Sequence, residues 1–156
     1  SLDEDAIIAH CKAHLAPFKV PSSVVFTDVL PRSGGGKVVN LGSAAGTAGR
    51  SNYLVYSAVK AGVINMTRSF AVALAPHGIN VNCLAPGNTA TPMNENVRTE
   101  PEYAEIYATI QDKTPSPRAF ADPREMAGTI LFLCSDDAQA AYGAMLLMDE
   151  GVSAGY

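Results

Sequence analysis

The sequence contains few cysteines, no tryptophan and no excess of positive charge. It has three cysteines among 156 residues, and 11 basic residues against 15 acidic ones. Cys11, Cys83 and Cys134 are far apart and form no C-x-x-C pair, which argues against a disulfide framework and against a thiol-rich zinc site. The net charge of -4 offers no cationic surface for a phosphate backbone, so nucleic acid is not expected as a partner.

Signals for a membrane or for secretion are also missing. The longest apolar runs are shorter than the roughly 18 to 20 residues that a membrane-spanning helix needs. The first residues, SLDEDA, are acidic and lack the basic flank of a signal peptide. We therefore expect a soluble, cytoplasmic protein without a membrane partner.

The composition and the order of apolar segments are typical of a folded α/β protein. Hydrophobic residues make up 47% of the chain and charged residues 17%, which is enough for a core in one ordinary domain or in two small pieces. Parallel strands need crossover helices, and apolar periodicity together with Gly and Pro turns predicts such an alternation. The expected helices cover about 2–15, 53–75 and 122–133, and the expected strands cover 24–27, 38–42, 79–87 and 144–148.

A further amphipathic helix is expected within residues 93–121. Tyr103, Ile106, Tyr107 and Ile110 follow the i, i+3, i+4, i+7 spacing of one helix face. The segment comes after the carboxyl end of a strand, which is where ligands bind in open α/β sheets. It is either a mobile lid over a substrate or an ordinary packed surface helix.

Tyr56 and Lys60 are the first candidates for chemistry, because they lie four residues apart on a predicted helix and so share one face. A neighbouring cation in a site closed to water favours the phenolate form of a tyrosine. Such a pair also arises by chance, as a half-buried tyrosine beside a solvated lysine. Two features favour the chemical interpretation: Ser43 ends the preceding strand, and PGNTATPM follows the next strand.

With Ser43, Tyr56 and Lys60 in this order, the sequence resembles the second half of the short-chain dehydrogenase/reductase family. The matching segments are VVNLGSAAG, YSAVKAGVINMTRSFAVALAPHGINVNCLAPGNTATPM and PREMAGTILFLCSDDAQAAYGAMLLMDEG. The resemblance covers about residues 34–156. It implies a partial Rossmann-like layer of three parallel strands with crossover helices, preceded by an N-terminal helix and a short strand.

The resemblance also implies roles for the matching residues. Tyr56 would exchange a proton with the carbonyl or alcohol oxygen of a small-molecule substrate, and Ser43 would hydrogen-bond the same oxygen. Lys60 would assist Tyr56 and hold the ribose hydroxyls of a nicotinamide cofactor, NAD or NADP. The cofactor pocket would further include Pro86, Gly87 and Thr91. Family members associate as dimers or tetramers, so a homo-oligomer is implied.

The dinucleotide-binding half of that family has no counterpart in the sequence. The family places a glycine-rich turn after its first strand, with the pyrophosphate at the next helix N-terminus. Gly34, Gly35 and Gly36 precede a strand instead. We therefore expect an NAD(P)-dependent carbonyl/secondary alcohol oxidoreductase with impaired activity, or else a non-catalytic remnant that folds without binding cofactor.

The first residues resemble a different family, the small C-terminal domain of adenylate-forming acyl-CoA synthetases. The matching pieces are HLAPFKVP, VVFTDVLP and RSGGGK. We therefore expect a fusion of two fragments, covering 1–37 and 38–156. His10, Cys11 and His14 lie within one helical turn of the first fragment, but a solvated helix face explains them better than a metal site, so no metal is expected.

Overall fold

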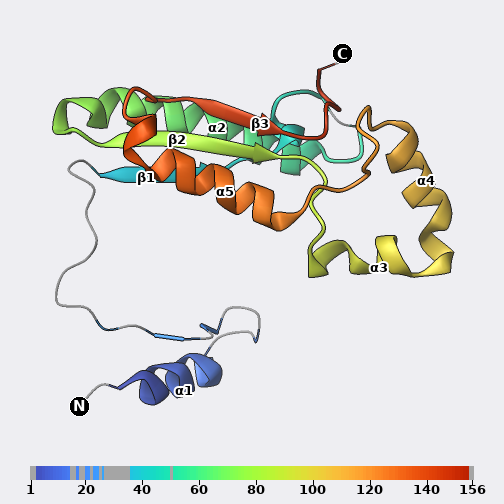
Figure 1. Cartoon of the computed structure of the whole chain (residues 1–156), viewed down its shortest axis with the longest axis horizontal. Coiled ribbons are helices and arrows are strands. Elements are labelled where there is room, and N and C mark those ends of the chain that lie inside the picture. The colour runs from blue at the N-terminus through green and yellow to red at the C-terminus, as the bar shows by residue number, and fades with distance from the viewer. Residues whose placement is uncertain are drawn as a thin grey trace. The chain divides into compact units, whose positions relative to one another are not determined.

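The structure is a computed structural model of the chain (Figure 1). It describes residues 3–14, 17, 20, 21, 23, 24, 26, 36–49 and 51–154. The chain divides into two compact units, Ser1–Arg32 and Ser33–Tyr156. No helix in the described part of the chain is both long and apolar enough to cross a bilayer.

The N-terminal unit contains the expected helix, α1 (Glu4–His14). The helix is capped by Asp3, whose Oδ1 accepts a hydrogen bond from the amide of Ala6 at 2.8 Å. On the helix surface the rings of His10 and His14 stack with their centroids 4.2 Å apart.

The short strand expected over 24–27 is not seen at the two positions that the structure describes. Val24 and Phe26 have no strand assignment, and residues 25 and 27 lie outside the described residues. The amide of Val24 instead donates to Oε1 of Glu4 at 3.0 Å. A β-branched and aromatic composition predicts a strand only where a neighbouring strand is present to pair with it.

The second unit is built on a sheet of three parallel strands, as the sequence predicts. The strands are β1 (Lys37–Leu41), β2 (Asn80–Pro86) and β3 (Met145–Met148), in the order β1-β2-β3. β2 is the central strand, and its residues from Asn80 to Ala85 are all buried. Burial on both faces explains the consecutive apolar residues Cys83, Leu84 and Ala85. The first half of the strand also contains Asn80 and Asn82, whose buried amides are hydrogen-bonded.

Two long helices cross over between the strands and cover opposite faces of the sheet (Figure 1). α2 (Leu54–Leu74) connects β1 to β2, and α5 (Pro123–Cys134) connects β2 to β3. The face under α5 holds a core of Leu84, Ala121 and Met126, against which Val39, Ile130, Leu146 and Met148 pack. α2 is followed by a short 3-10 turn that ends at Gly78, whose φ of 70° is the left-handed cap expected at this position.

Buried amides join the amino-terminal end of the sheet to the loop before β3. The side-chain amide of Asn80 donates to the carbonyls of Gln139 and Ala141, and that of Asn82 also donates to Ala141. Lys37 lies in β1, and its Nζ donates to Oδ1 of Asn80 at 3.0 Å. These bonds satisfy polar groups that would be costly to leave unpaired in the interior.

Two short helices lie between β2 and α5 and stand beyond the end of the sheet (Figure 1): α3 (Glu95–Thr99) and α4 (Ala104–Asp112). The sequence predicts α4 but not α3. The ring of Tyr107 on α4 stacks on Phe120, with the centroids 5.9 Å apart. Neither helix buries a residue completely. Movement of this segment stays a prediction.

The start of α5 is stabilised by a capping box. Oδ1 of Asp122 accepts from the amide of Arg124 at 2.8 Å, and Oε2 of Glu125 accepts from the amide of Asp122 at 2.9 Å. Arg118 binds Glu125 at 3.0 Å and Glu150 at 2.6 Å, and so connects the segment before α5 to the segment after β3. The amide of Asp122, and then the hydrogen bond from Arg118, lower the pKa of Glu125.

This depressed pKa predicts how stability depends on pH. Glu125 contributes stability above its ordinary pKa, and the contribution is lost as the pH falls through its depressed pKa and the carboxylate is protonated. Glu125→Gln keeps the capping acceptor but removes the charge, so the melting temperature should fall less steeply over this range than in the wild type. Thermal unfolding followed by circular dichroism measures the slope. Glu105→Gln, on the exposed surface of α4, is the control and should keep the wild-type slope.

Candidate active site

A cavity of about 520 Å³ lies where the carboxyl ends of all three strands meet. Its wall comes from the turn after β1, from the start of α2, and from the segments that follow β2 and β3. The lining residues are Ser43, Ala44, Ala45, Tyr53, Tyr56, Gly87, Asn88, Thr89, Thr91, Met93, Asn94, Asp149 and Val152. Segments far apart in the sequence thus contribute to one hollow.

Ser43 stands at the end of β1 as the N-cap of the 3-10 turn Ala44–Gly46. Its side chain is buried, and its Oγ accepts a hydrogen bond from the amide of Ala45 at 3.2 Å. A hydroxyl carries one proton besides its acceptor lone pairs. Since the amide uses an acceptor site, the Ser43 proton is available to donate to an oxygen in the cavity.

The turn that carries Ser43 lies directly against α2. A Cβ on Gly46 would lie 2.7 Å from the backbone nitrogen of Ala61 and 2.7 Å from the carbonyl carbon of Lys60. Real Cβ atoms do not approach backbone so closely, and backbone cannot move aside as a flexible side chain can. Glycine at position 46 is therefore what allows the turn to reach the helix that carries Tyr56 and Lys60.

Tyr56 and Lys60 lie one turn apart on α2, as their spacing predicts. The ammonium nitrogen of Lys60 is 5.7 Å from the centroid of the Tyr56 ring, within the range of a cation–π contact. It also donates to the carbonyl of Leu41, the last residue of β1, at 2.9 Å. This bond connects α2 to the strand end that leads into Ser43.

The site is more open than the sequence predicts. Tyr56 lines the cavity but is 47% exposed, and its phenol oxygen has no hydrogen-bond partner among the described residues. The described wall surrounds the cavity only in part, which explains why water reaches the ring. The phenol oxygen is therefore free to hydrogen-bond a ligand in the cavity, but water also reaches it.

Gly87 is required by the packing of two strand ends. A Cβ at this position would lie 2.7 Å from both the Cα and the Cβ of Asp149. Asp149 is buried in the cavity wall, and its carboxylate accepts from the amides of Gly151 at 3.2 Å and Ser153 at 2.8 Å. The family resemblance implies that Gly87 lies in the cofactor pocket. The close approach to Asp149 is a second reason for glycine at this position.

The structure gathers four of the six sequence-derived site residues, Ser43, Tyr56, Gly87 and Thr91, in the cavity wall. Lys60 lies beside the wall through its contact with the Tyr56 ring. Pro86 ends β2 and is not part of the wall. Their chemical roles stay predictions, because geometry alone does not assign a reaction.

Several wall residues were missed by sequence reasoning, among them Tyr53, Met93, Asn94 and Asp149. Asn94 had a readable signal, because it follows Thr91 at the three-residue spacing of a helix cap, with a proline between them. Asp149 had none, since only the pairing of β3 beside β2 brings it to the cavity. In the described part of the chain no group of three or more His, Cys, Asp or Glu side chains is placed to hold a metal ion.

A protein-family model described as Enoyl-(Acyl carrier protein) reductase matches residues 24–153 of the chain. Cis-4-hydroxycyclohexanecarboxylate dehydrogenase from Sinomonas cyclohexanicum is 43% identical over 122 residues, which cover 78% of this chain and 47% of that protein. The residues matched by the family model include all three strands and the whole cavity wall.

Solved structures show the same architecture. The crystal structure of a putative 2-deoxy-D-gluconate 3-dehydrogenase from Agrobacterium tumefaciens, with bound NADP, has a TM-score of 0.68 and 34% identity over 77% of this chain and 47% of that one. A 4-hydroxyisoleucine dehydrogenase in complex with NADH has a TM-score of 0.72 and 25% identity over 78% of this chain and 48% of that one. The chain spans about half the length of these relatives.

The contact between the 44–46 turn and α2 predicts the effect of adding one methyl group. Gly46→Ala should destabilise the fold by about 1 to 3 kcal/mol, because the new Cβ collides with backbone. Gly49→Ala in the same loop is the matched control, since a Cβ there meets nothing within 4 Å. Urea unfolding measures both variants. Equal stabilities would contradict the close approach at Gly46.

Proposed function

Because the chain belongs to the short-chain dehydrogenase/reductase family, we propose that its cavity holds the nicotinamide end of NAD or NADP beside a small carbonyl or secondary alcohol. The observation that carries the proposal is the placement of the Ser43 and Tyr56 side chains in one cavity wall, with Lys60 over the Tyr56 ring. The reaction is the interconversion of a ketone or aldehyde and an alcohol. A bound nicotinamide would supply or take up the hydride.

In this proposal Tyr56 moves the proton. Its phenol oxygen, which has no partner among the described residues, donates to the carbonyl oxygen during reduction and accepts from the alcohol during oxidation. Ser43 donates its free proton to the same oxygen and stabilises the charge that develops there. Both side chains are held by backbone elements that the Gly46 contact brings together.

The residues at the cavity also fit a nicotinamide ribose. Lys60 uses one of its three protons on the carbonyl of Leu41, which leaves two for the ribose hydroxyls and for the phenolate of Tyr56. Gly87 and Thr91 follow β2 in the wall, where a flat ring can approach the backbone. The relatives with bound NADP and NADH support this assignment.

A second candidate is a folded but non-catalytic chain, and the exposure of Tyr56 at the cavity favours it. Water that reaches a site weakens the electrostatic stabilisation on which the proposed reaction depends. We further propose that residues 1–37 are a separate fragment, related to adenylate-forming enzymes, and that residues 38–156 are the oxidoreductase half. Lys37 lies in β1 and binds Asn80, so it does not face the cavity wall.

Cofactor titration and one substitution test the proposed reaction. NADH and NADPH are titrated into the purified chain and followed by fluorescence, and oxidation of the bound cofactor is then assayed with a panel of ketones. Tyr56→Phe should lower turnover by at least about 100-fold, the usual contribution of a general acid, while cofactor affinity changes by less than about twofold.

The matched control is Tyr142→Phe, which removes a similarly exposed phenol outside the cavity and should leave turnover unchanged. Saturable binding without turnover in the wild type would support the non-catalytic candidate. Absence of binding up to millimolar cofactor would refute the proposed cofactor site in this chain.

We also propose that the chain forms a homo-oligomer through α2. Val55, Val59, Met66 and Phe70 follow helical spacing along one face of α2, and all of them are exposed. An apolar stripe of this length is typical of a helix that packs against a partner.

A charge on this stripe tests the oligomer. Val59→Asp should lower the molar mass measured by light scattering toward that of the monomer, because a carboxylate cannot be buried unpaired at the contact. Leu131→Asp places the same charge on an equally apolar exposed position of α5 and serves as the control, with no expected change. A monomeric wild type would contradict the proposal.

A further inference from the structure

Asn94 is the centre of a hydrogen-bond network at the cavity wall. Its Oδ1 accepts from the backbone amide of Thr91 at 3.1 Å, and its Nδ2 donates to the carbonyl of Thr89 at 2.8 Å. One side chain therefore closes the loop between two residues that both line the cavity. The bonds use both ends of the amide, so neither an aliphatic nor a hydroxyl side chain reproduces them.

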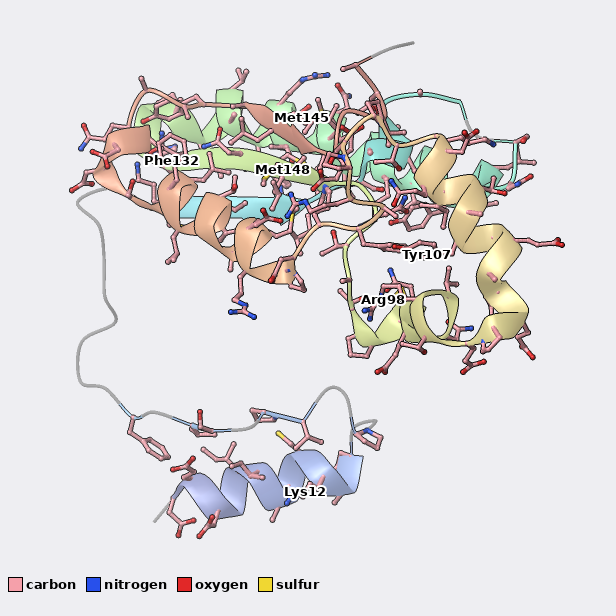
Figure 2. All side chains as sticks on the ribbon, turned by 45° about the vertical axis from the view of Figure 1, so that its right-hand side comes forward. Lys12, Arg98, Tyr107, Phe132, Met145 and Met148 are labelled. Carbon is pink, nitrogen blue, oxygen red and sulfur yellow. The ribbon has the colours of Figure 1, made fainter. Side chains whose placement is uncertain are left out.

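Arg98, one turn further along on α3 (Figure 2), completes the network. Its Nε donates to Oδ1 of Asn94 at 3.1 Å, and its Nη2 donates to the carbonyl of Thr91 at 3.1 Å. Thr91 is thus held at both its amide and its carbonyl. Two bonds in different directions from one planar group require the fixed fork of a guanidinium, which a lysine does not have.

The same loop is anchored on its other side by the backbone. The amide of Ala90 donates to the carbonyl of Ala121, and the amide of Ala121 donates to the carbonyl of Asn88, both at 2.9 Å. Thr89 and Ala121 form a parallel β-bridge. The Asn94 and Arg98 bonds therefore restrain the one stretch, Thr91 to Asn94, that this backbone bridge does not reach.

The charge of Arg98 does not account for its position. It is half-buried, and in the described part of the chain it forms no ion pair, since its guanidinium donates to a carbonyl and to an amide oxygen. The neighbouring acids Glu95 and Glu102 are exposed. A guanidinium that binds two neutral acceptors, one of them a backbone carbonyl, holds the backbone in place rather than neutralising a charge.

We propose that Asn94 and Arg98 are positioning residues that hold the backbone of Thr91 in the cavity wall, so that α3 acts as a brace for the ligand site. The consequence for cofactor binding rests on the proposed function, in which Thr91 contacts the nicotinamide. The holding of Thr91 itself does not depend on that function, because it follows from four hydrogen bonds within the chain.

Amide hydrogen exchange measured by NMR tests the brace directly. In Asn94→Ala the Thr91 amide should exchange about tenfold faster, which corresponds to the loss of one hydrogen bond. Asn94→Asp keeps the acceptor for Thr91 and for Arg98, so it should retain the protection. Thr99→Ala is the control on the same helix, because its hydroxyl donates only within α3, to the carbonyl of Glu95.

Two exchange results would overturn the proposal. One is a wild-type rate at Thr91 in Asn94→Ala. The other is an equal acceleration of amides in β2 and at Thr91, which would mean that the variant only destabilises the whole unit. Protection in β2 is therefore measured in every variant as the reference.

The second arm measures cofactor affinity by fluorescence titration with NADPH and NADH. Arg98→Ala and Arg98→Lys should both weaken binding about tenfold, because an ammonium cannot bond to Thr91 and Asn94 together. Wild-type affinity in Arg98→Lys would overturn the positioning role in favour of simple charge attraction. If the wild type binds neither cofactor, the proposed function fails, while the exchange arm, extended to Arg98→Lys, still decides whether Asn94 and Arg98 hold the Thr91 loop.

Discussion

The cavity depends on the contact between the backbone of the 44–46 turn and the backbone of α2. At Gly46 the backbone of the turn and the backbone of α2 approach more closely than any side chain would allow. This contact places Ser43, at the end of β1, beside the first turns of α2, where Tyr56 and Lys60 share one face. The bond from Lys60 to Leu41 reinforces the same junction from the helix side. The close backbone approach at Gly46 thus brings the hydroxyl of Ser43 to the helix that carries the Tyr56 phenol and the Lys60 ammonium group.

The rest of the wall depends on the order of the strands. β2 lies in the centre of the three-stranded sheet, so the segments after β1 and after β3 end on either side of it. The approach of Gly87 to Asp149 is the second place where backbone comes so near that a larger residue would not fit. Beyond it, α3 holds the Thr91 loop through Asn94 and Arg98. The segment that the sequence presents as either a lid or a packed surface helix therefore also has a structural connection to the cavity wall.

Several surfaces around the cavity are exposed in the described part of the chain. In the described part of the chain, β1 pairs with β2 alone, and Val38 and Leu41 on this strand are exposed. Tyr56 is half exposed at the cavity, and the α2 stripe is uncovered. A parallel strand with a free edge and a helix with an apolar outer face are both favourable places for further protein to pack. The residues proposed to carry the reaction thus lie together at one cavity, while the surfaces around them in the described part of the chain are open to solvent.

Local patterns in the sequence predicted the three parallel strands, the helices other than α3, and the pairing of Tyr56 with Lys60, because periodicity acts over a few residues. A strand at 24–27 was wrongly predicted at the positions described, since strand formation needs a partner that composition does not reveal. Only the tertiary structure decided that Asp149 and Asn94 stand in the same wall as Ser43, and that position 46 must be glycine. Those facts concern distances between segments far apart in the sequence, which depend on how the sheet and its helices pack and on no local signal.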